Sequence, residues 1–220
     1  MDAAGLSRTT VELDAGESIP NLDDFDILLV MGGPMDVWEQ QQHPWLVAEK
    51  AAIRYWVQTR KRPYLGLCLG HQLLADTLGG TVAAAETPEI GVMSVQLTAS
   101  GERHPLFAGL PTTMSVLQWH SAEVLELPQG GEVLAYSDAC AVNAMAYGAC
   151  AFGLQYHVEL TARTVDEWSA IPEYANALRD SCGAGALESM RSEADARLAE
   201  FQSSAAAIFA NFLQIARAAS

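Results

Sequence analysis

The feature that most constrains this chain is a cysteine between two glycines, where a predicted strand turns into a predicted helix. The short apolar run 63–67 favours a strand, and residues 71–78 favour a helix that a glycine pair ends. Gly66 and Gly70 flank Cys68. Small flanking residues suit a strained turn whose central side chain projects into a cleft. The sequence therefore predicts a nucleophile elbow, although a free cysteine is also commonly a small buried hydrophobe.

Strand-like and helical stretches alternate along the rest of the chain. Strands are predicted at 9–13, 25–31, 91–98, 113–119, 133–136, 141–147 and 151–158, and helices at 44–58, 164–178 and 186–219. This alternation predicts an α/β fold with a parallel sheet covered by helices on both faces. The absence of an internal repeat or linker predicts one domain over 1–220, with a core at about 9–160 and a helical C-terminal segment at 161–220.

Composition narrows the class of protein. Of the 220 residues, 12 are Lys or Arg and 27 are Asp or Glu, which gives a formal net charge of −15. This charge disfavours nucleic acid and anionic membranes as partners. No run approaches the ~20 apolar residues that span a bilayer, and the first residues lack a basic leader, so a cytoplasmic protein is expected. The four cysteines show no metal-ligand spacing, and neither a metal nor a cofactor is expected.

A thiolate nucleophile needs an imidazole that can hold and later deliver a proton. Among the five histidines, His157 ends an apolar strand and has Glu159 two residues on. On an extended backbone these two side chains point to the same face, so the carboxylate can reach one ring nitrogen. Cys68, His157 and Glu159 are therefore the predicted triad. A histidine at a strand end beside a solvated acid is the plainer alternative.

Acyl chemistry also needs hydrogen-bond donors aimed at the developing oxyanion. Ligands in open α/β sheets gather at the carboxyl ends of the strands, where the turns after residues 31, 67 and 156 converge. The backbone amides of Gly33 and Leu69 are the predicted donors. Four of the five tryptophans are assigned to core or helix-face packing, namely Trp38, Trp45, Trp56 and Trp168.

The glycine pair at 32–33, GLCLGHQ at 66–72 and HVE at 157–159, in this order, resemble the signatures of the class I (triad) glutamine amidotransferases. The resemblance covers about residues 9–160. Further segments are similar to a stand-alone group whose members are often labelled as GMP synthase glutaminase-domain proteins: 33–35, 45–50, 88–91, 118–121 and 143–148.

This resemblance implies a flavodoxin-like three-layer αβα fold and hydrolysis of the side-chain amide of glutamine. Cys68 then attacks the carboxamide, and His157 delivers a proton to the leaving ammonia. The resemblance also places Gln72, Trp119 and His120 where family members hold the backbone groups of glutamine, the last two mainly through main-chain atoms.

Two departures from the family pattern stand out. Val158 replaces the usual proline between the histidine and the glutamate, and a small effect is expected because valine keeps the strand extended. Family members also generally begin with an apolar strand and a helix, which this sequence lacks. We therefore expect either a shortened form with compromised stability or another segment in that place.

Three functions stay open from the sequence. A glutaminase would release ammonia to solvent or to a separate synthetase subunit, because no phosphate-binding GxxxxGK[ST] loop accompanies the elbow. The same triad could cleave other γ-glutamyl compounds, such as γ-glutamyl peptides. A catalytically silent binding or regulatory protein is the third function. Whether two copies form a homodimer is also open.

Overall fold

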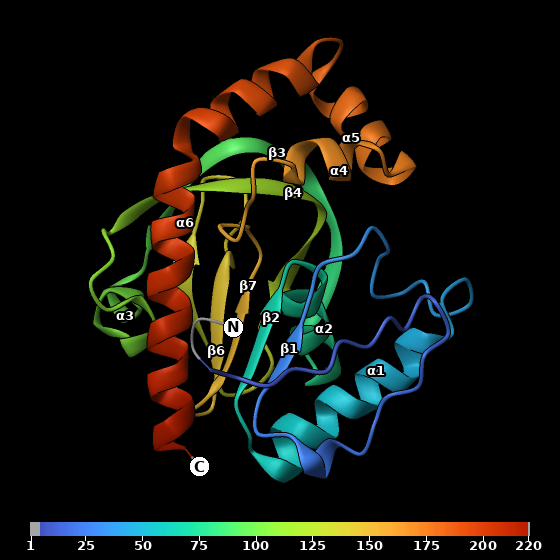
Figure 1. Cartoon of the computed structure of the whole chain (residues 1–220), viewed down its shortest axis with the longest axis vertical. Coiled ribbons are helices and arrows are strands. Elements are labelled where there is room, and N and C mark those ends of the chain that lie inside the picture. Colours follow the sequence, from blue (N-terminus) through green and yellow to red (C-terminus); the bar gives the residue numbers. More distant parts are fainter. Residues whose placement is uncertain (1–4, 220) are drawn as a thin grey trace.

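The computed structural model describes residues 5–219, in which seven strands form one sheet in the order β1-β2-β7-β6-β5-β3-β4 (Figure 1). The strands are Leu28–Val30 (β1), Tyr64–Leu67 (β2), Thr81–Leu97 (β3), Thr113–Glu126 (β4), Gly131–Tyr136 (β5), Ala144–Tyr147 (β6) and Ala151–Leu154 (β7). Strands β1, β2 and β7 are parallel, and the other neighbours pair antiparallel. The prediction of a parallel sheet is therefore wrong for the four antiparallel pairs, which link β7, β6, β5, β3 and β4. Residues 148–150 join β6 to β7, too few for the crossover that parallel pairing needs.

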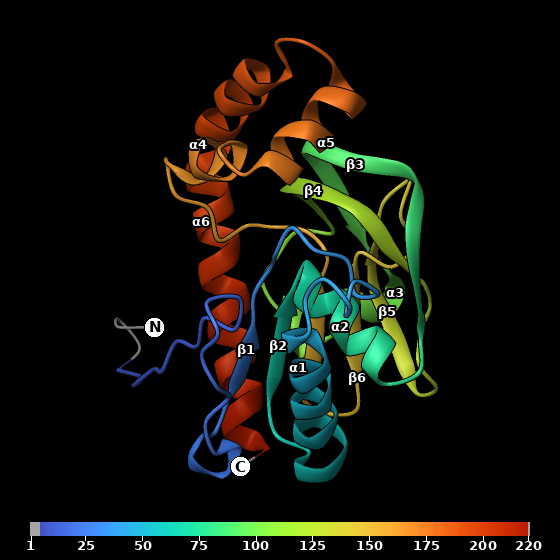
Figure 2. The same ribbon diagram turned by 90° about the vertical axis from the view of Figure 1, so that its right-hand side faces the viewer.

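One face of the sheet is covered by the two helices nearest the elbow (Figure 2). Helix α1 (Trp45–Arg54) continues as a π-helical segment, η3 (Tyr55–Arg60), and α2 (Leu69–Thr77) follows β2 directly. Leu46, Ile53 and Trp56 are fully buried, as the predicted amphipathic helix over 44–58 requires. Short helical segments occupy Leu22–Asp24 (η2), Ala99–Arg103 (α3) and Pro105–Phe107 (η4).

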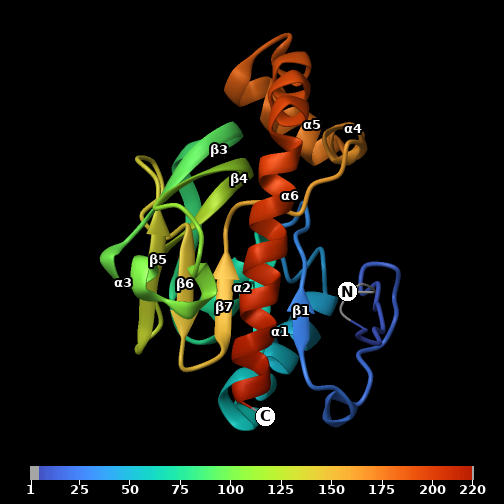
Figure 3. The ribbon, with the colours of Figure 1, turned by 60° about the vertical axis from the view of Figure 1, so that its left-hand side comes forward.

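The C-terminal helices cover the other face and one end of the sheet (Figure 3). They are α4 (Thr164–Ser169), α5 (Pro172–Cys182) and α6 (Ala186–Ala218). The buried Phe201 and Phe212 of α6 belong to the larger apolar core. The predicted single helix over 164–178 is wrong. Proline has no backbone N–H to continue a helix, and Pro172 instead begins α5.

Residues 9–13 do not form the predicted strand. They lie in an irregular segment that leads into turns closed by backbone bonds from Ala15 N to Glu12 O and from Gly16 N to Leu13 O. A strand needs a neighbour to satisfy its backbone groups, and no strand of residues 5–219 pairs with this segment. Within those residues β1 is consequently an edge strand with β2 as its one partner, and Leu6 packs against the larger core instead.

Candidate active site

The elbow cysteine lies between β2 and α2 in a strained backbone conformation. Cys68 has φ 50° and ψ −104°, and its N–H donates to Leu154 O of β7 at 2.7 Å. Such a conformation in a residue other than glycine costs about 1–3 kcal/mol. The flanking glycines are required by close packing. A Cβ on Gly66 would lie 2.4 Å from Gly70 O, and one on Gly70 would lie 2.3 Å from Val30 O.

The residues of the predicted triad lie together at the carboxyl ends of β2 and β7. His157 Nδ1 lies 2.5 Å from Glu159 Oε1, and Cys68 and the same imidazole both lie beside Gly32, each 3.4 Å from where a Cβ on that glycine would stand. Both oxygens of Glu159 are engaged, because Oε2 accepts from Val158 N at 2.9 Å. His157 is also held by its backbone, which exchanges two 2.9 Å bonds with Leu117 of β4.

The electrostatics of this group favour a charged imidazole. Burial alone would lower the pKa of His157, but the Glu159 carboxylate and the Cys68 side chain raise that pKa to about 10. Burial would likewise raise the pKa of Glu159, but the charge and hydrogen bond of His157 hold it below its ordinary value. At neutral pH the pair is therefore imidazolium and carboxylate. An imidazolium is the form that can give a proton to a leaving amine.

The two residues predicted to supply the oxyanion donors are neighbours of each other, and Leu69 directly follows Cys68. Leu69 is the first residue of α2, and the first amides of a helix have no partner within it. A Cβ on Gly33 would lie 3.1 Å from a Leu69 side-chain carbon, so the two residues are neighbours. Gly32 lies directly against Cys68 and His157. A Cβ there would lie 3.4 Å from both Cys68 Cβ and His157 Cε1, so any larger residue would crowd the triad.

The side chains of the three predicted substrate-binding residues are engaged within the protein. Gln72 Nε2 donates to Ala122 O at 3.0 Å and to Gln155 Oε1 at 3.1 Å. Trp119 Nε1 donates to Tyr174 O at 3.2 Å. His120 contacts Glu89 and Ala122 O through its two ring nitrogens. Main-chain contacts from Trp119 and His120 to a substrate stay a prediction.

The C-terminal helices supply an aromatic wall that sequence reasoning missed. The Trp168 ring of α4 packs edge-on against the His157 imidazole, with ring centroids 4.5 Å apart. Tyr174 of α5 and Trp119 complete the cluster around Trp168. Burial, then the charge of the nearby Cys68, raises the pKa of Tyr174, so its hydroxyl stays protonated. Helical periodicity indicated packing for Trp168, and only the tertiary structure shows that its partner is His157.

Residues 5–219 contain neither a candidate membrane-spanning helix nor a candidate metal-binding cluster. None of their helices combines the length and apolar character that crossing a membrane requires. Within the same range no cluster of three or more His, Cys, Asp or Glu side chains is arranged to hold a metal ion.

The fold and site together define a mixed α/β protein with a cysteine elbow and a Cys-His-Glu group at the carboxyl ends of parallel strands. A family model for class I glutamine amidotransferases matches residues 3–168. The chain belongs to the class I glutamine amidotransferase family.

Two named relatives illustrate this membership. The chain is 36% identical over 156 residues to the glutamine amidotransferase-like protein YfeJ of Salmonella typhimurium, covering 69% of this chain and 64% of that protein. It therefore spans less than two thirds of the length of that relative. It is 33% identical over 160 residues to a subunit of the glutamine-hydrolysing GMP synthase of Sulfurisphaera tokodaii, covering 72% of this chain and 80% of the relative.

Solved structures agree on the fold. A glutamine amidotransferase of Thermotoga maritima superposes with a TM-score of 0.83 at 24% identity, covering 96% of this chain and 88% of the other. A glutamine amidotransferase of Methylobacillus flagellatus superposes with a TM-score of 0.84 at 25% identity, covering 97% of this chain and 86% of the other. The expected class I amidotransferase fold is thus confirmed.

Proposed function

We propose that this protein hydrolyses the side-chain amide of glutamine through a thioester on Cys68 and releases ammonia. The observation that carries the proposal is the placement of Cys68, on a strained elbow, beside an imidazolium that Glu159 holds at 2.5 Å. Membership of the family supports glutamine as the substrate.

In the first half-reaction, the Cys68 sulfur attacks the side-chain carbonyl carbon of glutamine and a C–S bond forms. The carbonyl oxygen becomes an oxyanion, for which the amides of Gly33 and Leu69 are the proposed donors. His157 gives its proton to the amide nitrogen, the C–N bond breaks, and ammonia leaves. A γ-glutamyl thioester remains on Cys68.

In the second half-reaction, neutral His157 takes a proton from water as the water oxygen attacks the thioester carbon. The C–S bond breaks, glutamate leaves, and the Cys68 thiolate and the imidazolium are restored. Glu159 stays ionised throughout and keeps Nδ1 protonated. Gln72 and the main chain of Trp119 and His120 are proposed to hold the backbone groups of the substrate.

We propose further that the ammonia passes to a separate synthetase subunit. The support is the relative from Sulfurisphaera tokodaii, which is named as one subunit of a glutamine-hydrolysing GMP synthase. Transfer would appear as glutamine-dependent amination of the acceptor when the synthetase is added.

The decisive experiment measures ammonia release from glutamine by the purified protein, beside a γ-glutamyl dipeptide as an alternative substrate. We expect turnover of glutamine that is abolished in Cys68→Ala and retained in Cys140→Ala. Cys140 is a matched control because burial raises the pKa of its thiol to about 12. Faster cleavage of the dipeptide would assign the triad to γ-glutamyl hydrolysis instead, and no turnover of either substrate by folded protein would indicate a silent member.

A further inference from the structure

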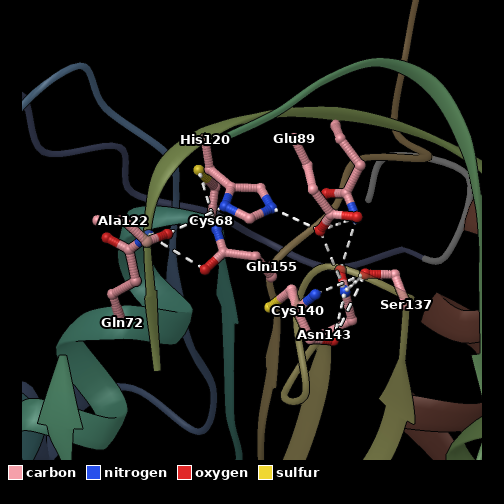
Figure 4. A network of polar contacts seen from close by, with 10 residues as sticks. Cys68, Gln72, Glu89, His120, Ala122, Ser137, Cys140, Asn143 and Gln155 are labelled. Atoms are coloured by element: carbon pink, nitrogen blue, oxygen red, sulfur yellow. Dashed lines mark hydrogen bonds and ion pairs between the residues drawn. The ribbon is translucent and has the colours of Figure 1, made fainter. Parts of the chain in front are cut away.

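A second polar network, separate from the His157–Glu159 pair, reaches the sulfur of the nucleophile (Figure 4). Gln155 Nε2 lies 3.6 Å from Cys68 Sγ, and Gln155 Oε1 accepts from Gln72 Nε2 at 3.1 Å. Gln155 is fully buried and Gln72 is 4% exposed. The sulfur therefore has two polar neighbours, the imidazole and the Gln155 amide.

The acceptor Ala122 O determines which group of each glutamine donates and which accepts in this network. A backbone carbonyl can only accept, so the group that Gln72 presents to Ala122 O at 3.0 Å must be its NH₂. The same NH₂ faces the Gln155 side chain, which must therefore present its oxygen. The Gln155 NH₂ is then left to point at Cys68 Sγ. If the Gln155 amide were turned round, its NH₂ would face the NH₂ of Gln72, and two donors would oppose each other.

A buried histidine–glutamate pair holds the carbonyl at the start of this network. His120 Nδ1 donates to Ala122 O at 3.0 Å, and Glu89 Oε2 accepts from His120 Nε2 at 3.1 Å. Burial would raise the pKa of Glu89, but donors from His120, Ser137 and Asn143 hold it below its ordinary value. A backbone carbonyl can only accept, so His120 Nδ1 is the donor to Ala122 O, and the Glu89 carboxylate holds the ring through its other nitrogen.

We propose that Gln155 is a further catalytic residue, whose amide N–H stabilises the Cys68 thiolate, and that Gln72 is a positioning residue that orients this amide. The proposal rests on the proposed glutaminase function. A hydrogen bond to an ionised sulfur is stronger than one to a neutral thiol. Gln155 thus acts twice, on the attacking thiolate and on the thiolate that leaves when the thioester is hydrolysed. Glu89 and His120 support the orientation from a distance.

The test compares Gln155→Met with the wild-type protein. Methionine keeps a similar length and volume and removes the N–H, while Gln72 retains Ala122 O as an acceptor. The rate of Cys68 alkylation by iodoacetamide is followed from about pH 5 to about pH 10, cysteine by cysteine, by mass spectrometry. We expect the half-maximal pH for Cys68 to rise by about one unit, the equivalent of a tenfold change in thiolate population. We also expect kcat to fall about tenfold, with KM for glutamine within about threefold.

Two further variants test whether Gln72 orients the Gln155 amide and whether the effect is specific to this network. Gln72→Met leaves Gln155 free to rotate, so a smaller shift of the Cys68 profile in the same direction is expected. Gln96→Met is the matched control, because Gln96 is an exposed residue of β3 whose side chain bonds only Tyr136 among the described contacts. Its profile and turnover should equal those of the wild type.

Circular dichroism and the melting temperature confirm that each variant is folded. If Gln155→Met does not fold, Gln155→Asn replaces it, since the shorter amide withdraws its N–H from Sγ. A folded variant with the wild-type pH profile of Cys68 alkylation overturns the proposal. Absence of glutamine turnover in the wild type would instead overturn the proposed function, and the alkylation profile would still decide whether Gln155 acts on the thiolate.

Discussion

Two histidine–glutamate pairs serve the elbow cysteine, one directly and one through the Gln72–Gln155 network, and they differ in exposure and in freedom. In the His157–Glu159 pair the Glu159 side chain is 30% exposed, whereas both side chains of the His120–Glu89 pair are at most 4% exposed. His157 carries one carboxylate bond and faces the thiol. His120 has both ring nitrogens bonded, to Glu89 and to Ala122 O.

The difference shows how neighbours assign roles to the same two residue types. An imidazole can exchange protons in a reaction only if one of its nitrogens faces the reacting group. His157 meets this condition because Glu159 occupies only Nδ1. His120 does not, so its pair serves to hold β3, β4 and the Gln72–Gln155 network in place. Substitutions in the two pairs should therefore affect different quantities.

The largest effect is expected from His157→Asn. Loss of the proton carrier should lower kcat for glutamine by about 10⁴-fold, the upper range for general acid–base catalysis. The melting temperature should change far less than the activity. Steady-state ammonia release and circular dichroism measure the two quantities. His43→Asn is the matched control, because His43 lies in the loop before α1 and should retain full activity. A His157→Asn variant with more than a tenth of wild-type kcat would contradict the proposed role.

A smaller loss, about 100-fold in kcat, is expected from Glu159→Gln, because the backbone bonds to Leu117 and the Trp168 contact still hold the imidazole. This variant also makes a pH prediction. The raised pKa of His157 stabilises the fold fully below pH 6.5, and this contribution is lost as the pH rises toward about 10. The lowered pKa of Glu159 contributes above pH 4.5 and is lost below it.

The melting-temperature difference between wild type and Glu159→Gln should consequently be largest between pH 4.5 and 6.5 and should shrink toward pH 10. Thermal unfolding at several pH values measures it. Glu188→Gln, an exposed change on α6, should show no such pH dependence. A difference that grows with rising pH would show that the ion pair is not the source of the stability.

The smallest effect on activity is expected from Glu89→Gln, about a threefold fall in kcat with KM little changed, because Glu89 acts on the sulfur only through His120, Gln72 and Gln155. Its effect on stability should be the clearer one. Weakening a buried hydrogen bond to a charged carboxylate costs about 2 kcal/mol, which lowers the melting temperature by roughly 4–8 °C in a domain of this size. Glu126→Gln on β4 is the control, since Glu126 is exposed and bonds Thr81. Equal stability of Glu89→Gln and wild type would remove the structural role of this pair.

Local signals in the sequence predict much of the site but less of its surroundings. The glycines around Cys68 and the two-residue spacing of His157 and Glu159 are features of residues close in the sequence. The structure places the side chains of Cys68, His157 and Glu159 together. Gln155 stands two residues before His157 in the same motif, yet nothing local shows that its amide faces the sulfur. Glu89 and His120 lie on paired strands, and their contact depends on the register of β3 against β4.

Two of the wrong predictions have the same origin, and the third does not. Residues 9–13 alternate as a strand does, but strand formation depends on a partner, and residues 5–219 supply none. The apolar runs of β5 and β6 do not reveal whether they pair parallel or antiparallel, because the length of the connection decides this. Pro172 was a local signal for the break between α4 and α5, and the predicted helix over 164–178 ignored it.

By itself the sequence determined the strand-elbow-helix unit around Cys68, the His157–Glu159 pair and the family, because each depends on residues a few positions apart. Only the tertiary structure decided which side chains surround the sulfur. Gln155 reaches Cys68 because β7 pairs with β2, and Trp168 and Tyr174 reach the His157 side of the site because α4 and α5 pack against each other there. The contact of Gln155 with Cys68 joins residues 87 positions apart, and no local periodicity records it.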